Sequence, residues 1–138
     1  MQRYIDYLSS KADNHIISYG LGDWFDIGPK SPGESQLTSN GVTATAIYYY
    51  DVTLMEKMAN LLGKPDDACK YQDLAAQIKQ AFNQTFWNPS TRTYDRNSQA
   101  ANAVALYMEL TTSENRQQVF DNLIADIRRR NNALTAGD

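Results

Sequence analysis

A two-residue interruption between two long amphipathic segments most constrains how this chain folds. Segments 42–62 and 65–85 each carry apolar residues at steps of three and four, the spacing of one helical face. Gly63 stands where a helix ends in a left-handed residue, and Pro65 suits the first position of the next helix. So short a connection makes the two helices antiparallel neighbours. The sequence therefore predicts a helical hairpin.

Each helix of this hairpin has a recognisable apolar stripe. The stripe of the first helix consists of Ile47, Tyr50, Leu54, Met58 and Leu61. The stripe of the second consists of Tyr71, Leu74, Ala75, Ile78 and Phe82. Thr38 or Ser39 can cap the start of the first helix, and two aspartates after Pro65 favour the start of the second.

Three further helices are predicted, over residues 2–12, 98–110 and 113–130. Thr111 with Glu114 fits a capping box for the last of them. Residues 86–97 read as a polar turn region and residues 131–138 as a loop, and no strand pattern competes. The predicted class is all-α, with about five helices arranged as antiparallel hairpins.

Residues 13–40 lack helical or strand periodicity and contain four of the seven glycines and two of the four prolines of the chain. A loop of this length inside a compact domain is usually functional or disordered. Because this one also carries Tyr19, Trp24, Phe25 and Ile27, we expect it to be ordered.

Charge and cysteine content exclude several classes of function. The formal net charge is −3, and basic residues cluster only in Arg128–Arg130 at a predicted helix end. The sequence therefore lacks the basic patch that is typical of nucleic-acid-binding proteins. No run approaches the ~18 apolar residues of a membrane span. No secretory-signal pattern is present either, and the compartment stays open. One cysteine, Cys69, and one histidine, His15, cannot make an internal disulfide or a closed zinc site.

The loop segment from Gly20 to Gly28 suits carbohydrate binding. The indole of Trp24 can pack on the C–H face of a sugar ring while Asp23 accepts hydrogen bonds from hydroxyls. The alternative is that Trp24 and Phe25 pin the loop to the core and that Asp23 caps a turn. Trp87 has the same two interpretations, as a second stacking platform or as a hydrophobic plug.

Other reactive side chains have simpler interpretations. Asp23 with Asp26 could form the carboxyl pair of a glycosidase, as could Glu34 with Asp51, but turn-stabilising aspartates and a solvated Glu34 are the favoured interpretation. Three consecutive tyrosines, 48–50, predict core packing with one hydroxyl at a polar edge. Cys69 is expected to be a small buried residue and His15 a surface or capping one.

Residues 62–82 loosely imitate one tetratricopeptide unit. Such repeats recur every 34 residues and need about three copies for stability, and only one is present. A non-catalytic helical protein-interaction module, built as a tetratricopeptide-like hairpin scaffold, is therefore the alternative function.

The order of motifs along the chain resembles the catalytic domain of bacterial α-L-rhamnosidases, the six-hairpin (α/α)₆ glycosidases. The resemblance covers nearly the whole chain. Its motifs are Gly22-Asp23-Trp24, Thr43 to Asp51, Met58 to Lys64, Asp67-Ala68, Tyr71, Ile78-Lys79, Ala81-Phe82-Asn83, Ser98-Gln99-Ala100 and Leu134-Thr135-Ala136-Gly137.

This resemblance implies hydrolysis of terminal α-L-rhamnosyl linkages with inversion, acting on a rhamnose-containing glycoside or polysaccharide without a metal or organic cofactor. In the family, the general acid belongs to an Arg-Asp-Glu segment before the region that starts at Met1. The base belongs to a hairpin after the region that ends at Asp138. We therefore expect no catalytic residue within this chain. Trp24, beside Asp23, matches a sugar-contacting position, and Trp87 is the candidate for a second aromatic wall.

The length of the chain indicates that it is an internal fragment of such an (α/α)₆ domain. Twelve helices with ordinary loops need at least ~190 residues, whereas this chain has 138. Residues 1–138 are therefore expected to form part of a single (α/α)₆ domain, with no complete domain boundary inside the chain. Such a partial toroid should be inactive alone and should self-associate through exposed helix faces.

Overall fold

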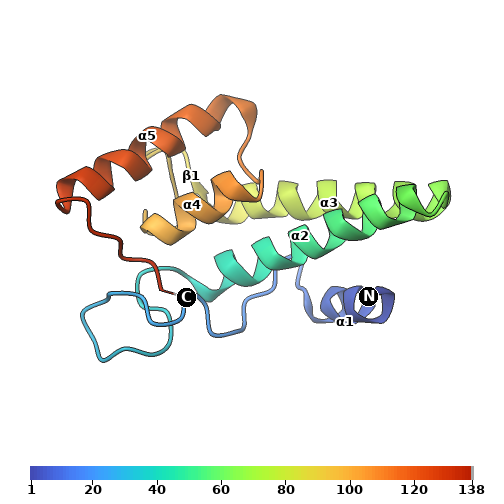
Figure 1. Cartoon of the computed structure of the whole chain (residues 1–138), viewed down its shortest axis with the longest axis horizontal. Coiled ribbons are helices and arrows are strands. Elements are labelled where there is room, and N and C mark those ends of the chain that lie inside the picture. Colours follow the sequence, from blue (N-terminus) through green and yellow to red (C-terminus); the bar gives the residue numbers. More distant parts are fainter. Residues whose placement is uncertain (138) are drawn as a thin grey trace.

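The computed structural model describes residues 1–137 and shows, within that range, five helices and one short β-ribbon (Figure 1). The elements are α1 (Gln2–Lys11), α2 (Asn40–Leu61), α3 (Pro65–Phe86), β1 (Trp87–Asn88), β2 (Thr93–Tyr94), α4 (Gln99–Tyr107) and α5 (Ser113–Arg129). The predicted all-α class with one long loop is confirmed.

The hairpin of α2 and α3 forms where the sequence predicts it. Gly63 has a φ of +63°, the left-handed conformation that favours glycine. Its N–H donates to the carbonyl of Asn60 at 3.1 Å, and the N–H of Lys64 donates to that of Ala59 at 2.9 Å. Pro65 then begins α3. These bonds occupy carbonyls that the end of α2 would otherwise leave unpaired.

Two hydrophobic clusters hold the helices together. The first joins α1, α2 and α3 and consists of Ile5, Leu8, Ile17, Tyr48, Val52, Tyr71, Ala75 and Ile78. The second joins α2 and α3 to β2, α4 and α5 and consists of Val42, Ala46, Phe82, Tyr94, Ala101, Ala105, Leu110 and Val119. The stripe predicted for α3 supplies core residues to both clusters, as expected.

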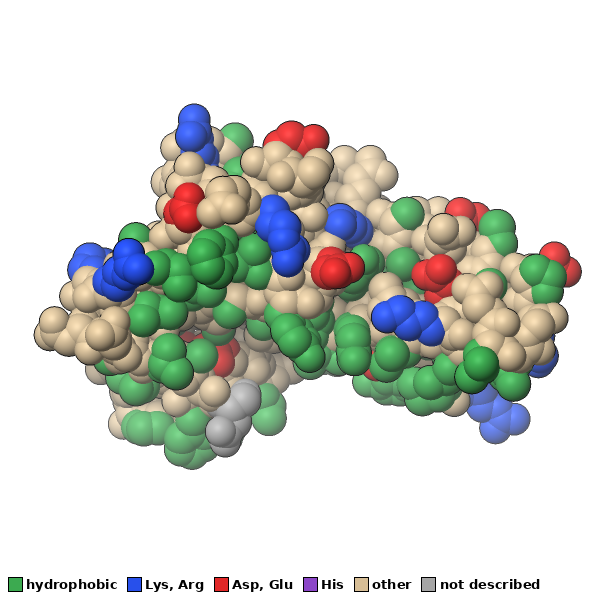
Figure 2. Space-filling model, turned by 45° about the horizontal axis from the view of Figure 1, so that its top comes forward, with side chains coloured by type: hydrophobic (Ala, Val, Ile, Leu, Met, Phe, Trp, Pro, Cys, Tyr) green, Lys and Arg blue, Asp and Glu red, His purple; other side chains and the backbone are tan. Residues whose placement is uncertain are grey.

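The stripe predicted for α2 is not its core face. Leu61 is 87% exposed and Ile47 50% exposed, whereas Val42 and Val52 on other faces are fully buried. The reason is that α2 carries apolar residues all round, so a periodic stripe does not reveal which face meets α3. Hydrophobic side chains therefore remain at the surface. Figure 2 shows such side chains along the half of the molecule that contains α1, α2 and α3.

Local capping also differs from prediction. Thr112, not Thr111, caps α5 by accepting the N–H of Asn115 at 3.3 Å, while Thr111 is buried. Ser39 lies at the start of α2, but its hydroxyl donates to Asp95 Oδ1 at 2.6 Å instead of capping the helix.

Two further expectations are wrong. Cys69 is exposed, because it lies on the outer side of α3. The predicted turn region contains an antiparallel two-stranded ribbon, in which Trp87 pairs with Tyr94 and Asn88 with Thr93. Of the helices in the described residues, none combines the length and apolarity that crossing a membrane requires.

Candidate functional site

The long loop between α1 and α2 is tied to the start of α2. The hydroxyl of Thr45 accepts the N–H of Ile17 at 3.0 Å and donates to the Ile17 carbonyl at 3.2 Å. The side-chain amide of Asn40 donates to the Gly20 carbonyl at 2.7 Å. The segment that follows, residues 20–38, is called the aromatic loop below.

Asp26 organises the aromatic loop from inside. Its side chain is only 2% exposed, and its Oδ2 accepts the N–H groups of Gln36 at 2.8 Å and Leu37 at 2.6 Å. Its Oδ1 is buried and has no hydrogen-bond partner among residues 1–137. Enclosed in this way, Asp26 acts as a loop-stabilising aspartate, one of the two interpretations of the sequence.

Asp23 is held by the far end of the chain. It is 6% exposed, and its Oδ1 accepts the N–H of Gly137 at 2.8 Å. Burial raises the pKa of Asp23 above its ordinary value, the Gly137 N–H opposes this shift, and the negative charge of Asp26 adds to it. Asp23 is thus a buried hydrogen-bond acceptor whose negative charge lowers the stability of the folded protein.

Trp24 is half-buried beside Asp23, and its ring centroid lies 5.2 Å from that of Phe25 in an edge-on arrangement. Phe25 is 51% exposed and adopts a φ of +63°, and its N–H donates to the Gly33 carbonyl at 2.8 Å. Neither aromatic belongs to the two hydrophobic clusters. The aromatic loop therefore presents aromatic surface to solvent instead of anchoring in the core.

The residues after α5 return to this loop and bring the end of the described chain beside it (Figure 1). We call residues 133–137 the strap. The N–H of Ile27 donates to the Thr135 carbonyl at 3.0 Å. Gly137 lies so close to the Trp24 carbonyl that a Cβ at position 137 would overlap it. The closing Thr-Ala-Gly motif of the sequence is thus a contact to Asp23 and Trp24.

A buried polar cluster fastens the strap to α4 and α5. Gln99 is 3% exposed, and its Oε1 accepts the N–H of Thr135 at 3.0 Å. Its Nε2 donates to the Ala133 carbonyl at 3.2 Å and to Asp126 Oδ2 at 2.9 Å. Sequence reasoning did not assign these residues a role, because a glutamine in an alanine-rich helix and an aspartate near a helix end carry no local signal of burial.

Asp126 is ionised at the centre of this cluster. Burial by itself would raise its pKa, but hydrogen bonds from Gln99, Arg129 and Arg130 outweigh burial and bring the pKa below its ordinary value. The Nε of Arg130 lies 2.8 Å from Asp126 Oδ2, and Arg129 contacts Oδ1. The arginines at the end of α5 therefore serve an internal carboxylate as well as the helix dipole.

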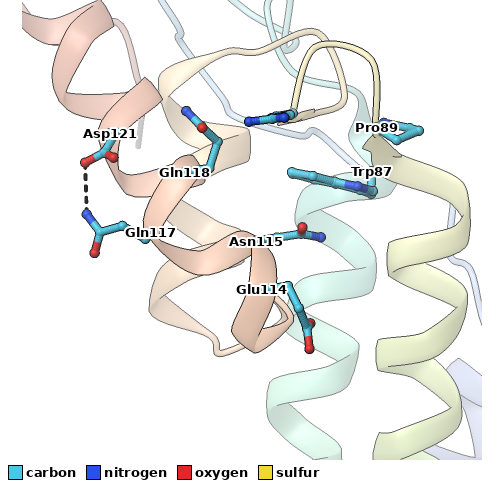
Figure 3. Close-up of a pocket in the computed structure, with 8 residues that line it drawn as sticks. Trp87, Pro89, Glu114, Asn115, Gln117, Gln118 and Asp121 are labelled. Atoms are coloured by element: carbon cyan, nitrogen blue, oxygen red, sulfur yellow. Dashed lines mark hydrogen bonds between the residues drawn. The ribbon is translucent and has the colours of Figure 1, made fainter.

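Trp87 lines a separate pocket of about 450 Å³, between the end of α3 and the first half of α5 (Figure 3). The indole packs against Tyr94 at a centroid distance of 5.1 Å, with the two ring planes tilted by 58°. The pocket is lined by Trp87, Pro89, Arg92, Glu114, Asn115, Gln117, Gln118 and Asp121. None of these residues comes from the aromatic loop, so the structure does not bring Trp24 and Trp87 into one pocket.

The other reactive residues stay apart. Glu34 is exposed, and Asp51 is half-buried on α2. Burial raises the pKa of Asp51. Tyr48 is buried with its hydroxyl 2.6 Å from Ser9 Oγ, as predicted for one of the three tyrosines. Within residues 1–137, no three side chains of His, Cys, Asp or Glu gather as a metal-binding set.

The described residues thus form antiparallel helical hairpins whose longest loop carries a buried carboxylate and a half-buried indole. The family model described as the bacterial alpha-L-rhamnosidase 6 hairpin glycosidase domain matches residues 1–138. The chain belongs to this family, and the family and fold expected from the motif order are confirmed.

Individual proteins of known name are also similar to this chain in sequence and in structure. An alpha-L-rhamnosidase of Streptomyces avermitilis is 31% identical over 135 residues, which cover 97% of this chain and 12% of the relative. The structure of alpha-L-rhamnosidase from Dictyoglumus thermophilum superimposes with a TM-score of 0.89 at 32% identity, covering 99% of this chain and 16% of that one. The Streptomyces avermitilis enzyme complexed with L-rhamnose gives a TM-score of 0.85 at 28% identity, with 99% and 12% covered.

Proposed function

We propose that this chain is part of an α-L-rhamnosidase that cleaves terminal α-L-rhamnosyl residues with inversion. It supplies one wall of the sugar-binding site. The chain spans about an eighth of the Streptomyces relative, and the structure of that relative is described as complexed with L-rhamnose. On this proposal, residues 1–138 are one section of a single (α/α)₆ domain, and the substrate is a rhamnose-containing glycoside or polysaccharide.

The observation that carries the proposal is the arrangement of Asp23 and Trp24. A carboxylate next to a half-buried indole offers a sugar both an acceptor for hydroxyls and an apolar face for C–H groups. Asp23 Oδ1 accepts the Gly137 N–H at 2.8 Å, while its Oδ2 makes no hydrogen bond within residues 1–137. That second oxygen is the group proposed to meet a sugar hydroxyl.

Trp87 is proposed as a second carbohydrate contact, in its own pocket. The indole packs against Tyr94 in a tilted arrangement, and α5 presents the side chains of Asn115 and Gln118 on the side of the pocket nearer to it (Figure 3). Amides and carboxylates beside an aromatic ring match the alternating polar and apolar surface of a saccharide. This pocket would take a sugar unit remote from the one at Trp24.

The catalytic carboxyls are proposed to lie outside residues 1–138. Inversion needs a general acid and a general base about 6.5–9.5 Å apart, with room for a water molecule. Asp26 is occupied by two loop N–H groups, and Glu34 is solvent-exposed, so neither offers such a pair with Asp23. The 138-residue chain alone should therefore be inactive.

Two experiments test the proposal. In the full-length protein that contains this chain, Trp24→Ala should weaken L-rhamnose binding at least tenfold by calorimetry, while Tyr107→Ala, a matched control at an exposed aromatic, should not. The purified 138-residue chain should release no p-nitrophenol from p-nitrophenyl α-L-rhamnoside. Turnover by that chain, abolished by Asp23→Asn, would refute the placement of the catalytic carboxyls.

The alternative, a helical protein-interaction module, predicts different behaviour. A monomeric chain with sharp cooperative unfolding, and a full-length protein whose calorimetric titration with L-rhamnose gives no signal, would favour it. Binding of L-rhamnose that depends on Trp24 would reject it.

A further inference from the structure

The strap touches the sugar-binding wall at three points. Its Gly137 N–H donates to Asp23 Oδ1 at 2.8 Å, and its Thr135 carbonyl accepts the Ile27 N–H at 3.0 Å. Gly137 also lies directly against the Trp24 carbonyl. Both residues proposed to contact sugar are therefore positioned by a segment more than 100 positions away in the sequence.

The strap has no regular secondary structure, so its position depends on what holds it. Gln99, the first residue of α4, bonds the strap twice, at Thr135 N–H and at the Ala133 carbonyl. The orientation of its amide is unambiguous. The Thr135 N–H can only donate and the Asp126 carboxylate can only accept, so Oε1 must face the first and Nε2 the second.

Asp126 in turn is fixed by Arg129 and Arg130 at the end of α5. The buried Gln99 amide thus links α4, Asp126 of α5 and the strap at one point. A buried polar group of this kind is costly unless every partner is present, so the cluster has one well-defined arrangement.

We infer that Gln99 is a positioning residue for the sugar-binding wall: it holds the strap whose Gly137 N–H and Thr135 carbonyl set the position of Asp23 and Trp24. This inference rests on the proposed function of Asp23 and Trp24. Gln99 itself does not contact the aromatic loop through any hydrogen bond within residues 1–137, so it acts through the strap.

Gln99→Glu is the sharpest test, because it keeps the shape of the side chain and the acceptor for Thr135. It removes the N–H donors to Ala133 and Asp126 and sets a second negative charge against Asp126. Gln72→Glu makes the same chemical change at an exposed position of α3. It is the matched control.

Two readouts are needed in the full-length protein. Hydrogen exchange followed by mass spectrometry should show amides of residues 23–28 and 133–137 exchanging at least tenfold faster in Gln99→Glu, and unchanged in Gln72→Glu. L-rhamnose affinity should fall at least tenfold in Gln99→Glu alone, measured well below its melting temperature.

A rescue variant separates positioning from loss of stability. In Gln99→Glu with Asp126→Asn, the new amide at 126 can donate to the new carboxylate at 99, which restores that one bond with its direction reversed. The rescue is partial, because Arg130 Nε loses the Asp126 Oδ2 acceptor that it shares with Gln99 and the Ala133 carbonyl stays without its donor. Affinity and exchange should return at least threefold toward wild type. This double variant also serves if Gln99→Glu by itself does not fold.

The outcomes are distinguishable. Wild-type protein that does not bind L-rhamnose overturns the proposed function. Wild-type binding that is unchanged in Gln99→Glu overturns the inference alone, as does unchanged exchange of the strap. If Gln99→Glu exchanges faster but keeps the wild-type affinity for L-rhamnose, the strap holds the loop without affecting sugar binding. This outcome too overturns the inference.

Discussion

Asp23 Oδ1 and the main-chain N–H of Gly137 are joined by a hydrogen bond of 2.8 Å although the two residues are 114 positions apart. This bond closes the described chain on itself at the loop that carries Trp24. The wall proposed to bind sugar is consequently made from two segments that lie far apart in the sequence, and changes in either segment should affect it.

The charge of Asp23 should cost stability at neutral pH. Burial raises its pKa in the folded protein, so its contribution to stability is fully present below the ordinary carboxyl pKa of about 3.9 and is lost as pH rises through the raised value. Asp23→Asn keeps an acceptor for Gly137 and removes that loss. We expect its Tm to exceed wild type by about 2 °C at pH 7 and to equal it near pH 3. A difference that is constant across pH, in thermal melts followed by circular dichroism, would contradict this.

Asp126 should show the opposite pH dependence. Its pKa is lowered, so its stabilisation is present above the ordinary carboxyl pKa and is lost as pH falls through the lowered value. Asp126→Asn should cost about 1 kcal/mol of unfolding free energy at pH 7, a modest figure because Arg129 is largely solvent-exposed. Urea titrations should show this cost shrinking below pH 4. A cost that grows on acidification would refute the ionised assignment.

Gly137→Ala should loosen the strap. Its new Cβ would overlap the Trp24 carbonyl, and the backbone would have to shift at a cost of about 1–3 kcal/mol. We expect weaker L-rhamnose binding together with lower stability. Ala136→Ser, at an exposed neighbour, is the control and should change neither. Normal affinity in Gly137→Ala would show that the close approach is not required.

Two substitutions decide whether Trp87 is a platform on which a sugar stacks or a hydrophobic plug that only fills space beside Tyr94. Trp87→Phe retains an aromatic ring on Tyr94, whereas Trp87→Ala removes it and should lower stability by about 3 kcal/mol. If Trp87 is a saccharide platform, both variants should bind a rhamnose-containing oligosaccharide more weakly, with free rhamnose unaffected. Affinity that falls in neither variant would leave Trp87 as a hydrophobic plug.

The isolated chain should self-associate through the unpartnered face of α2. Ile47, Met58 and Leu61 are each at least 42% exposed and lie on one stripe. Their burial between two copies removes apolar surface from water at about 25 cal/mol per Å². Light scattering after size exclusion should show concentration-dependent oligomers. Ile47→Gln with Leu61→Gln should reduce them, and a wild-type chain that stays monomeric would be evidence against this surface.

Much of the fold was accessible from local signals. The Gly63 and Pro65 punctuation predicts the hairpin of α2 and α3, because it depends only on backbone conformation and on a missing N–H. The stripe of α3 predicts its core face, since its other faces are charged. The stripe of α2 does not, because a helix that is apolar all round can bury any side.

Some residues of the candidate site could likewise be predicted from the sequence, and others could not. Asp23 and Trp24 could be singled out because a carboxylate beside an indole on a glycine-rich loop is an unusual local pattern. Gln99 and Thr135 stand in motifs of the family resemblance, but their role and that of Asp126 could not be predicted, because nothing in their neighbourhoods in sequence predicts that three polar groups bury together. The ribbon between Trp87 and Tyr94 was missed for a similar reason, since two residue pairs are too short for strand periodicity.

The sequence by itself determined the helices, their hairpin connection, the family and the identity of the loop that carries Asp23 and Trp24. Each of these depends on residue order within a few helical turns or on a recognisable motif. Only the tertiary structure decided that the strap lies on that loop, that Gln99 holds the strap, and that Asp23 is buried against Gly137. The physical reason is that hydrogen bonds between distant segments form only once packing has excluded water from both partners and brought them together.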